Sequence, residues 1–277
     1  MIRDITIGQY YPGDTWVHRL DPRLKIAVTL VFIVTLFLVR DFLGYVVAIA
    51  ALGGVIGISR VPLAFILRGL KAIFLIILFT FMLNMFMTAG TPLFRLGFLT
   101  VTREGLYSAV FMGLRLVLLI VGSSLLTLTT KPIKLTDGIE SLLGPLRVFG
   151  VPAHELAMMM TIALRFIPTL LEETDKIMKA QTARGADFES GSILRRAKNL
   201  IPILVPLFIS AFRIAQDLAM AMEARCYRGG EGRTKLHALR FEKRDAAATL
   251  LTALFVALIL LERVYADAIR AGLAALL

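Results

Sequence analysis

The sequence predicts an all-α integral membrane protein, in which a bundle of four to five transmembrane helices is joined to long, bent cytoplasmic helices. Hydrophobic residues make up 57% of its 277 residues, more than is usual in a soluble domain. They gather in runs close to the ~20 residues that a helix needs to cross a bilayer core. The basic residues lie mostly between these runs. These three observations exclude an ordinary soluble domain.

Five apolar runs are the candidate spans. They cover residues 26–39, 42–58, 72–87, 106–130 and 246–261. Glycines weaken the second run, so the expected number of spans is four or five. The chain is accordingly divided into N-terminal transmembrane helices (1–130), a cytoplasmic or interfacial region (131–244) and a C-terminal transmembrane helix (245–277).

The charge distribution predicts the orientation. The formal net charge is +11, and a cytoplasmic N-terminus would leave most Lys and Arg residues on the cytoplasmic side, as the positive-inside rule requires. The cytoplasmic segments would then be 1–25, 59–71 and 131–244. The basic residues form no patch of the kind that binds a nucleic-acid groove. We therefore expect a multi-pass protein with its N-terminus in the cytoplasm and no nucleic-acid partner.

The sequence carries little sign of chemistry of its own. The three histidines are scattered without metal-ligand spacing. The stretch "GGEGRTKL" at 229–236 lacks the spacing of a phosphate-binding loop. Cys226 is the single cysteine, so no internal disulfide can form. We expect no enzyme activity, no metal site and no cofactor in this chain.

The first helix has a recognisable start in "HRLDPRLK" at 18–25. Asp21 is suited to capping the first turn, and Pro22 fits the first helical position, where no backbone donor is needed. Arg23 and Lys25 are then expected at the level of the cytoplasmic headgroups. A helix start with charged anchors accounts for all of these residues.

The region 131–244 is too long for a loop without structure of its own. Breaks at Gly144-Pro145 and at 150–152 separate it into two long helical stretches, 153–184 and 192–225. The first would be roughly 48 Å long, which exceeds the bilayer core. Charged residues at 172–179 lie in the second half of the first stretch, which Pro168 should bend. Pro202 and Pro206 should bend the second stretch. An i,i+4 pair of Arg213 and Asp217 is expected there. Both helices are therefore expected to leave the membrane or to lie along its surface.

Each long helix ends in alanine, arginine and a small residue: Ala183-Arg184-Gly185 and Ala224-Arg225-Cys226. One such arginine is explained by the helix dipole, which favours a cation at a C-terminus by about 0.3–1 kcal/mol. Two of them, each with small neighbours, favour a second interpretation. A guanidinium binds carboxylates through a rigid fork, and small neighbours let a partner surface close around it. We expect two docking contacts.

Four stretches carry a family resemblance: "HRLDPRLK" at 18–25, "LRFIPTLLEE" at 164–173, "AQTARG" at 180–185 and "MEARCYRGG" at 222–230. With these motifs in this order, nearly the whole chain resembles the transmembrane T component of energy-coupling factor (ECF-type ABC) transporters. This family includes the cobalt and nickel transporter Q subunit. The resemblance implies an L-shaped, non-catalytic subunit of the prokaryotic cytoplasmic (inner) membrane.

The resemblance also implies partners. The two arginine motifs would dock into grooves on two cytoplasmic ATPase subunits, which bind the ATP and Mg. A membrane-embedded substrate-binding S component would contact the same helices on another face. The complex would import a micronutrient, either a vitamin or a transition-metal ion. The second motif departs from the family pattern, because Cys226 stands where glycine is common; this argues against a required positive φ at that position.

A methionine-rich surface is the candidate contact for the S component. Thioether chains repack easily, which suits an exchangeable partner. Ordinary helix packing is the more common explanation of such a stripe. The residues are Met158, Met159, Met160, Met220 and Met222.

A second function remains open from the residues alone. The chain could be a self-sufficient secondary transporter or membrane enzyme, because charged residues within membrane segments often mark a functional site. Such a site would lie around Arg115, Arg165 or the Arg213–Asp217 pair. This alternative predicts uptake or turnover by the purified chain without any partner.

Overall fold

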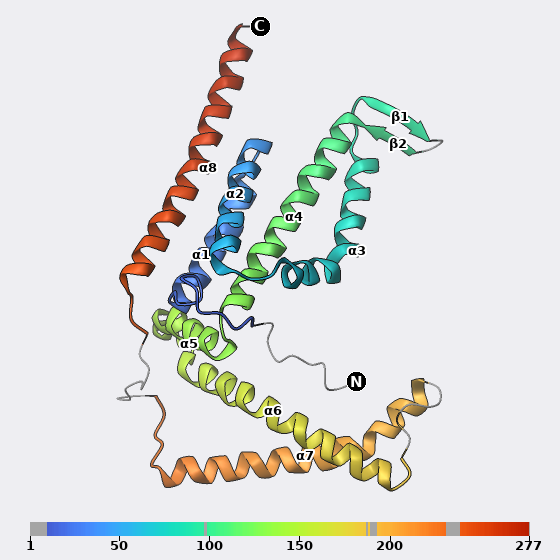
Figure 1. Cartoon of the computed structure of the whole chain (residues 1–277), viewed down its shortest axis with the longest axis vertical. Helices are drawn as coiled ribbons and strands as arrows, with labels where there is room; N and C mark the ends of the chain where they lie inside the picture. Colours follow the sequence, from blue (N-terminus) through green and yellow to red (C-terminus); the bar gives the residue numbers. More distant parts are fainter. Residues whose placement is uncertain (1–9, 97–98, 187, 189–192, 231–238, 277) are drawn as a thin grey trace. The chain divides into compact units, whose positions relative to one another are not determined.

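The computed structural model describes residues 10–96, 99–186, 188, 193–230 and 239–276, and helices dominate these ranges (Figure 1). The chain divides into two compact units, one comprising residues 9–138 and 239–277 and the other centred on residues 139–238. The expected all-α membrane fold is confirmed. We refer to the first unit as the bundle and to the second as the coupling unit.

Five long helices of the described ranges form the bundle. Helix α1 packs on α4 and α8, α2 packs on the same two helices, and α3 runs beside α4 (Figure 1). Residues far apart in sequence thus share one core. The helices are α1 (Pro22–Leu38), α2 (Phe42–Ser59), α3 (Leu63–Met87), α4 (Arg103–Thr129) and α8 (Lys243–Leu276).

The core of the bundle is apolar. Leu36 of α1, Tyr45 of α2, Leu128 of α4 and Ile259 of α8 are all fully buried. Most other large apolar side chains of the bundle are exposed. Exposed leucine, isoleucine and phenylalanine are destabilising in water but favourable against lipid tails. The distribution therefore suits helices surrounded by a bilayer.

The start of α1 is capped as expected. The Arg23 amide donates to the Asp21 carboxylate at 2.9 Å, and Pro22 is the first helical residue. The Asp21 amide donates to the Asp245 carboxylate at 2.8 Å, which joins the start of α1 to the start of α8. Lys25, expected at the level of the headgroups, has its side chain buried inside the bundle.

Two further features of the bundle were not expected. Helix α3 begins at Leu63, so most of the segment 59–71 is helical. Arg68 and Lys71 interrupt its hydropathy, which hid this first part of the helix. A short antiparallel hairpin, β1 (Pro92–Leu96) and β2 (Leu99–Thr102), joins α3 to α4. Its alternating pattern is too short to distinguish from a loop by sequence.

The coupling unit is built mainly from two long helices. Helix α5 (Pro132–Leu143), which begins in the bundle, and a 3-10 turn (Gly144–Phe149) precede α6 (Ala153–Ala183), so both expected breaks are confirmed. Helix α7 (Ile193–Ala224) packs on α6 and bends in its first half (Figure 1), the half that holds Pro202 and Pro206. Both helices match their expected bounds within one residue.

Among the described residues, six helices are long and apolar enough to cross a membrane: α2, α3, α4, α6 and parts of α7 and α8. This criterion concerns length and composition only. It includes α6 and α7, and it omits α1 because that helix has 17 residues. The protein is therefore a multi-pass membrane protein.

Candidate functional site: two arginine-capped helix ends

Helix α6 ends in a Schellman motif, a pair of backbone hydrogen bonds that satisfies the last carbonyl groups of a helix. The Ala186 amide donates to the Gln181 carbonyl at 3.0 Å, and the Gly185 amide donates to the Thr182 carbonyl at 2.9 Å. Gly185 has φ +90°, in the left-handed region. Arg184 is the C-cap residue directly before this turn.

Helix α7 ends in the same motif. The Tyr227 amide donates to the Met222 carbonyl at 3.0 Å, and the Cys226 amide donates to the Glu223 carbonyl at 2.8 Å. Arg225 follows the last helical residue, Ala224, as Arg184 follows Ala183. The two helix ends therefore present an arginine at the same position of the same local structure.

The expectation about Cys226 was wrong. Its φ is +54°, so the position adopts the left-handed conformation although it holds a residue with a Cβ. For an L-residue this conformation costs roughly 1–2 kcal/mol relative to the right-handed helix. The closing hydrogen bonds of the Schellman motif require the left-handed turn. The backbone geometry, and not glycine itself, is what the two ends share.

Both arginines are available to a partner. Arg184 and Arg225 are exposed, and so are their neighbours Ala183, Gly185, Ala224 and Cys226. Neither guanidinium has an ion pair or hydrogen bond to another side chain of the described residues. A charged fork surrounded by small, exposed side chains is free to enter a cavity lined with carboxylates.

The described residues after the α7 turn contact the beginning of α6. The Tyr227 hydroxyl lies 3.1 Å from the Met158 sulfur, so the chain after α7 contacts the first turns of α6. Gly230 approaches the His154 ring so closely that a Cβ would lie 2.4 Å from it. The His154 ring nitrogen Nδ1 lies 3.1 Å from the Glu140 carboxylate. These contacts hold the chain after α7 against the beginning of α6.

The methionine surface is only partly exposed. Met159, Met160 and Met220 are exposed, with 55%, 44% and 61% of their surface accessible. Met158 and Met222 are half-buried, and Met158 contacts Tyr227. Three of the five methionines are thus available for a partner, while Met158 packs within the unit.

A larger apolar stripe on α7 was missed from the sequence. It spans about three turns, and each of its six side chains is more than half exposed. The spacing i, i+3, i+4, i+7 places all six on one side of the helix, which is the signal that could have revealed it. The residues of this α7 stripe are Ile201, Leu204, Val205, Phe208, Ile209 and Phe212.

Arg115, the arginine within α4, is engaged in packing. Its guanidinium donates to the Tyr45 hydroxyl at 3.1 Å and to the Val39 carbonyl at 3.2 Å. It also lies over the rings of Phe37 and Phe111, at 5.4 and 5.1 Å from their centroids. These contacts join α4 to the end of α1 and to α2, which accounts for an arginine in this position.

The other residues of the alternative site do not come together as a site. Arg165, Arg213 and Asp217 are exposed. Among the described ion pairs none joins Arg213 to Asp217, so the expected i,i+4 pair was wrong. Within the described ranges, no three histidine, cysteine, aspartate or glutamate side chains are arranged to hold a metal ion.

Comparison with known proteins identifies the family. The model of the cobalt transport protein family matches residues 13–236. The energy-coupling factor transporter transmembrane protein EcfT of Clostridium kluyveri is 60% identical over 267 residues, which cover 96% of this chain and 99% of the relative. The proteins of the same name from Thermosediminibacter oceani and Bacillus subtilis are 60% and 49% identical, over 91% and 94% of this chain and 96% and 98% of the relatives.

These relatives are named as transmembrane proteins of a transport system, and the match extends over nearly the whole chain. The expected absence of enzyme activity therefore agrees with the family. The chain belongs to the family of energy-coupling factor transporter transmembrane proteins, the non-catalytic, energy-coupling membrane subunits of these transporters.

Proposed function

We propose that the ends of α6 and α7 dock into two cytoplasmic ATPase subunits and transmit their movement to a membrane-embedded, substrate-binding S component. The ATPases bind ATP and Mg, and this chain binds neither. The imported cargo is a micronutrient, a vitamin or a transition-metal ion. The family description, cobalt transport protein, supports this class of cargo. The membrane is the prokaryotic cytoplasmic membrane, with the N-terminus of the chain in the cytoplasm.

One observation carries the proposal: two exposed arginines occupy equivalent positions at the ends of two long helices. A single capping arginine needs no partner. Two equivalent ends match two equivalent motor subunits, because each guanidinium can be buried against carboxylates of one subunit. The long helices between the ends are rigid enough to convey a displacement along their length.

The α7 stripe and the exposed methionines supply the contact for the S component. The side chains of the α7 stripe and those of Met159, Met160 and Met220 are exposed apolar groups on α6 and α7. Lys176 and the acidic residues of 172–175 lie in the second half of α6. Because these charges are costly in lipid, we assign α6 and α7 to the coupling role and not to ordinary spans.

The decisive experiment is co-purification with the ATPases. The full chain is co-expressed with the ATPases and an S component of an ECF transporter, and the variant Arg184→Glu/Arg225→Glu is compared with the unchanged chain. Truncating one charged partner of a buried pair costs about 2–5 kcal/mol, so reversing two should abolish co-purification. The variant should still enter the membrane, since both side chains are exposed.

A matched control separates docking from charge alone. Arg165→Glu/Arg213→Glu changes the same net charge on the same two helices, but away from their ends. This control should retain both ATPases. Retention of the ATPases by the Arg184/Arg225 variant would overturn the proposal. Uptake by the purified chain alone in liposomes, lost in the control variant, would instead support the self-sufficient transporter.

A further inference from the structure

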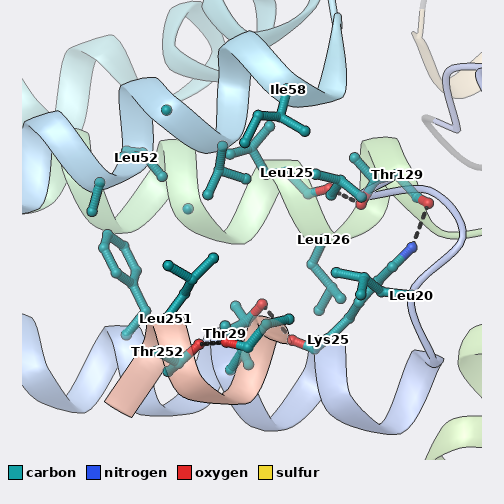
Figure 2. Close-up of a pocket in the computed structure, with 18 of the residues that line it drawn as sticks. Leu20, Lys25, Thr29, Leu52, Ile58, Leu125, Leu126, Thr129, Leu251 and Thr252 are labelled. Atoms are coloured by element: carbon teal, nitrogen blue, oxygen red, sulfur yellow. Dashed lines mark hydrogen bonds between the residues drawn. The ribbon is translucent and has the colours of Figure 1, made fainter. Parts of the chain in front are cut away.

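The bundle contains an apolar cavity of about 380 Å³ between α1, α2, α4 and α8 (Figure 2). This volume falls within the range of small-molecule binding sites. Leu52, Leu125, Leu126 and Leu251 lie along it. The hydroxyl groups of its threonines are occupied, because Thr29, Thr129 and Thr252 each donate to a backbone carbonyl of their own helix. The cavity therefore offers an apolar ligand a surface almost free of polar groups.

A second, smaller cavity of about 30 Å³ adjoins the first and is polar. Leu20, Lys25 and Thr129 line both cavities. The smaller cavity also receives Lys131 and Lys134, both of which are exposed. Its lining thus contains three lysines and no carboxylate. The two cavities together form one site with an apolar part and a cationic end.

Lys25 is the buried charge at this junction, with only 7% of its surface exposed. Its ammonium group donates to the Thr129 carbonyl at 2.9 Å, the His18 carbonyl at 3.1 Å and the Thr130 hydroxyl at 3.4 Å. Figure 2 shows this side chain reaching from α1 toward Thr129. No carboxylate of the described residues lies within 4 Å of it. A buried ammonium without a directly paired carboxylate is costly.

Asp245 attracts this charge from beyond salt-bridge distance, while Lys134 repels it. Asp245 is buried, but its two oxygens accept from the amides of Asp21 and Glu242, each at 2.8 Å. His18 donates from Nε2 to the Tyr11 carbonyl and accepts at Nδ1 from the Thr15 hydroxyl. Burial lowers the pKa of the His18 imidazole, so it stays neutral near pH 7. The charge of the lining is therefore that of the lysines.

We propose that this site binds one anionic phospholipid, with an acyl chain in the apolar cavity and its phosphate beside Lys25, Lys131 and Lys134. The three N–H groups of Lys25 are already occupied, so Lys25 contributes its charge. Lys131 and Lys134, at the end of α4 and in the first turn of α5, supply free donors. The lipid comes from the leaflet in which α1 begins and α4 ends. The proposal is independent of the ATPase contacts.

Trp16 makes the proposal testable, because it is the single tryptophan of the chain and it lines the apolar cavity. Bromine atoms on a lipid acyl chain quench tryptophan fluorescence on close contact. The full chain is reconstituted in phosphatidylcholine vesicles with increasing fractions of phosphatidylglycerol. In one series the bromine is on the phosphatidylglycerol acyl chains, and in a second series it is on the phosphatidylcholine acyl chains. Quenching of Trp16 then measures the affinity of the site for phosphatidylglycerol relative to phosphatidylcholine.

The headgroup contacts are tested with paired lysine variants. Each lysine near a membrane surface strengthens binding to an anionic lipid about fivefold. The unchanged chain should therefore prefer phosphatidylglycerol at least fivefold, and Lys131→Gln/Lys134→Gln should lose most of this preference. Lys243→Gln should keep it, because Lys243 is exposed at the start of α8 and lines neither cavity. All three substituted lysines are exposed, so folding is preserved.

The acyl-chain contact is tested with paired glycine variants. Gly54 lines the apolar cavity and Gly57 does not, and a Cβ on either would meet no atom within 4 Å. Gly54→Leu should fill the cavity and reduce quenching by brominated lipid, while Gly57→Leu should leave it unchanged. Equal effects of the two variants would show that Trp16 reports only on surrounding lipid and would overturn the proposal.

Two further results would also overturn it. The first is an equal affinity of the unchanged chain for the two lipids. The second is a preference for phosphatidylglycerol that an excess of inorganic phosphate removes, since the polar cavity would then hold a free anion and not a lipid headgroup.

Discussion

The ends of α6 and α7 have the same backbone geometry but different residues at its most demanding position. At the end of α6 that position is Gly185, and at the end of α7 it is Cys226. Both turn in the left-handed region, although only glycine does so without a steric cost. The arginine precedes this residue in both cases. The comparison teaches that the direction in which the arginine leaves the helix is preserved at some cost in local stability.

A second difference concerns anchoring. The residues after α7 contact the beginning of α6 through Tyr227 and Gly230. At the end of α6, Gln181 reaches the Pro202 carbonyl of α7 only at 3.5 Å. Among the described residues, the α7 end therefore has more contacts outside its own helix. Such contacts can compensate for the strain at Cys226.

The largest expected effect is a loss of ATPase binding when each of the two arginines is changed singly. Arg184→Glu and Arg225→Glu, made singly, should each weaken binding of the ATPases by about thirtyfold or more, because the proposed docking buries each charge against a partner. The affinity of each variant for the ATPases, measured on the purified complex, checks this expectation. Equivalent ends require losses of similar size. If one variant binds as well as the unchanged chain, the two ends are not equivalent docking contacts.

A smaller effect is expected at Gly185. Because its φ is +90°, Gly185→Ala should destabilise the end of α6 by roughly 1–2 kcal/mol. Hydrogen exchange of the Gly185 and Ala186 amides should accelerate about tenfold. Gly144→Ala is the control, since Gly144 lies in the same unit without a positive φ and a Cβ there would meet no atom within 4 Å. If Gly144→Ala accelerated exchange of these amides as much, the effect could not be attributed to the positive φ of Gly185.

An increase in local stability is expected from the opposite substitution at the end of α7. Cys226→Gly removes the steric cost of the left-handed turn and should stabilise the end of α7 by about 1 kcal/mol. Exchange of the amides at position 226 and at Tyr227 should slow about fivefold, with no loss of ATPase binding. Faster exchange would mean that the thiol makes a stabilising contact that outweighs the strain.

The smallest effect tests the anchoring of α7. Tyr227→Phe removes the hydroxyl that contacts the Met158 sulfur at 3.1 Å and should cost about 0.5 kcal/mol. Exchange of the Tyr227 amide, which is bonded to the Met222 carbonyl, should accelerate about twofold. Thr182→Val, which removes an exposed hydroxyl near the end of α6, should not affect it.

Local signals in the sequence were sufficient for α6, α7 and the start of α1, and for the position of the arginines. The bounds of α6 and α7, the cap at Asp21 and the breaks near Gly144 and Pro152 depend on the chemistry of a few neighbouring residues. The left-handed turn at Cys226 could not be inferred, because it depends on hydrogen bonds that override the preference of the residue.

Long-range packing could not be predicted from the sequence either, because it depends on partners that are distant in the chain. Lys25 has the pattern of a headgroup anchor, yet its ammonium group reaches carbonyls of the distant Thr129 and of His18. Arg115 has the pattern of a transport residue, yet Tyr45 and Val39 bind its guanidinium. In both cases the deciding partners lie on other helices. Hydropathy also missed the start of α3 at Leu63, since Arg68 and Lys71 mask it.

The thiol at the end of α7 has a practical consequence. Cys226 is the chain's single cysteine, and it is exposed directly after Arg225. A maleimide dye would therefore attach at one defined place in the natural sequence, without prior removal of other thiols. Its emission would change as a binding partner approached that helix, so the attachment of a motor protein could be timed in a stopped-flow instrument.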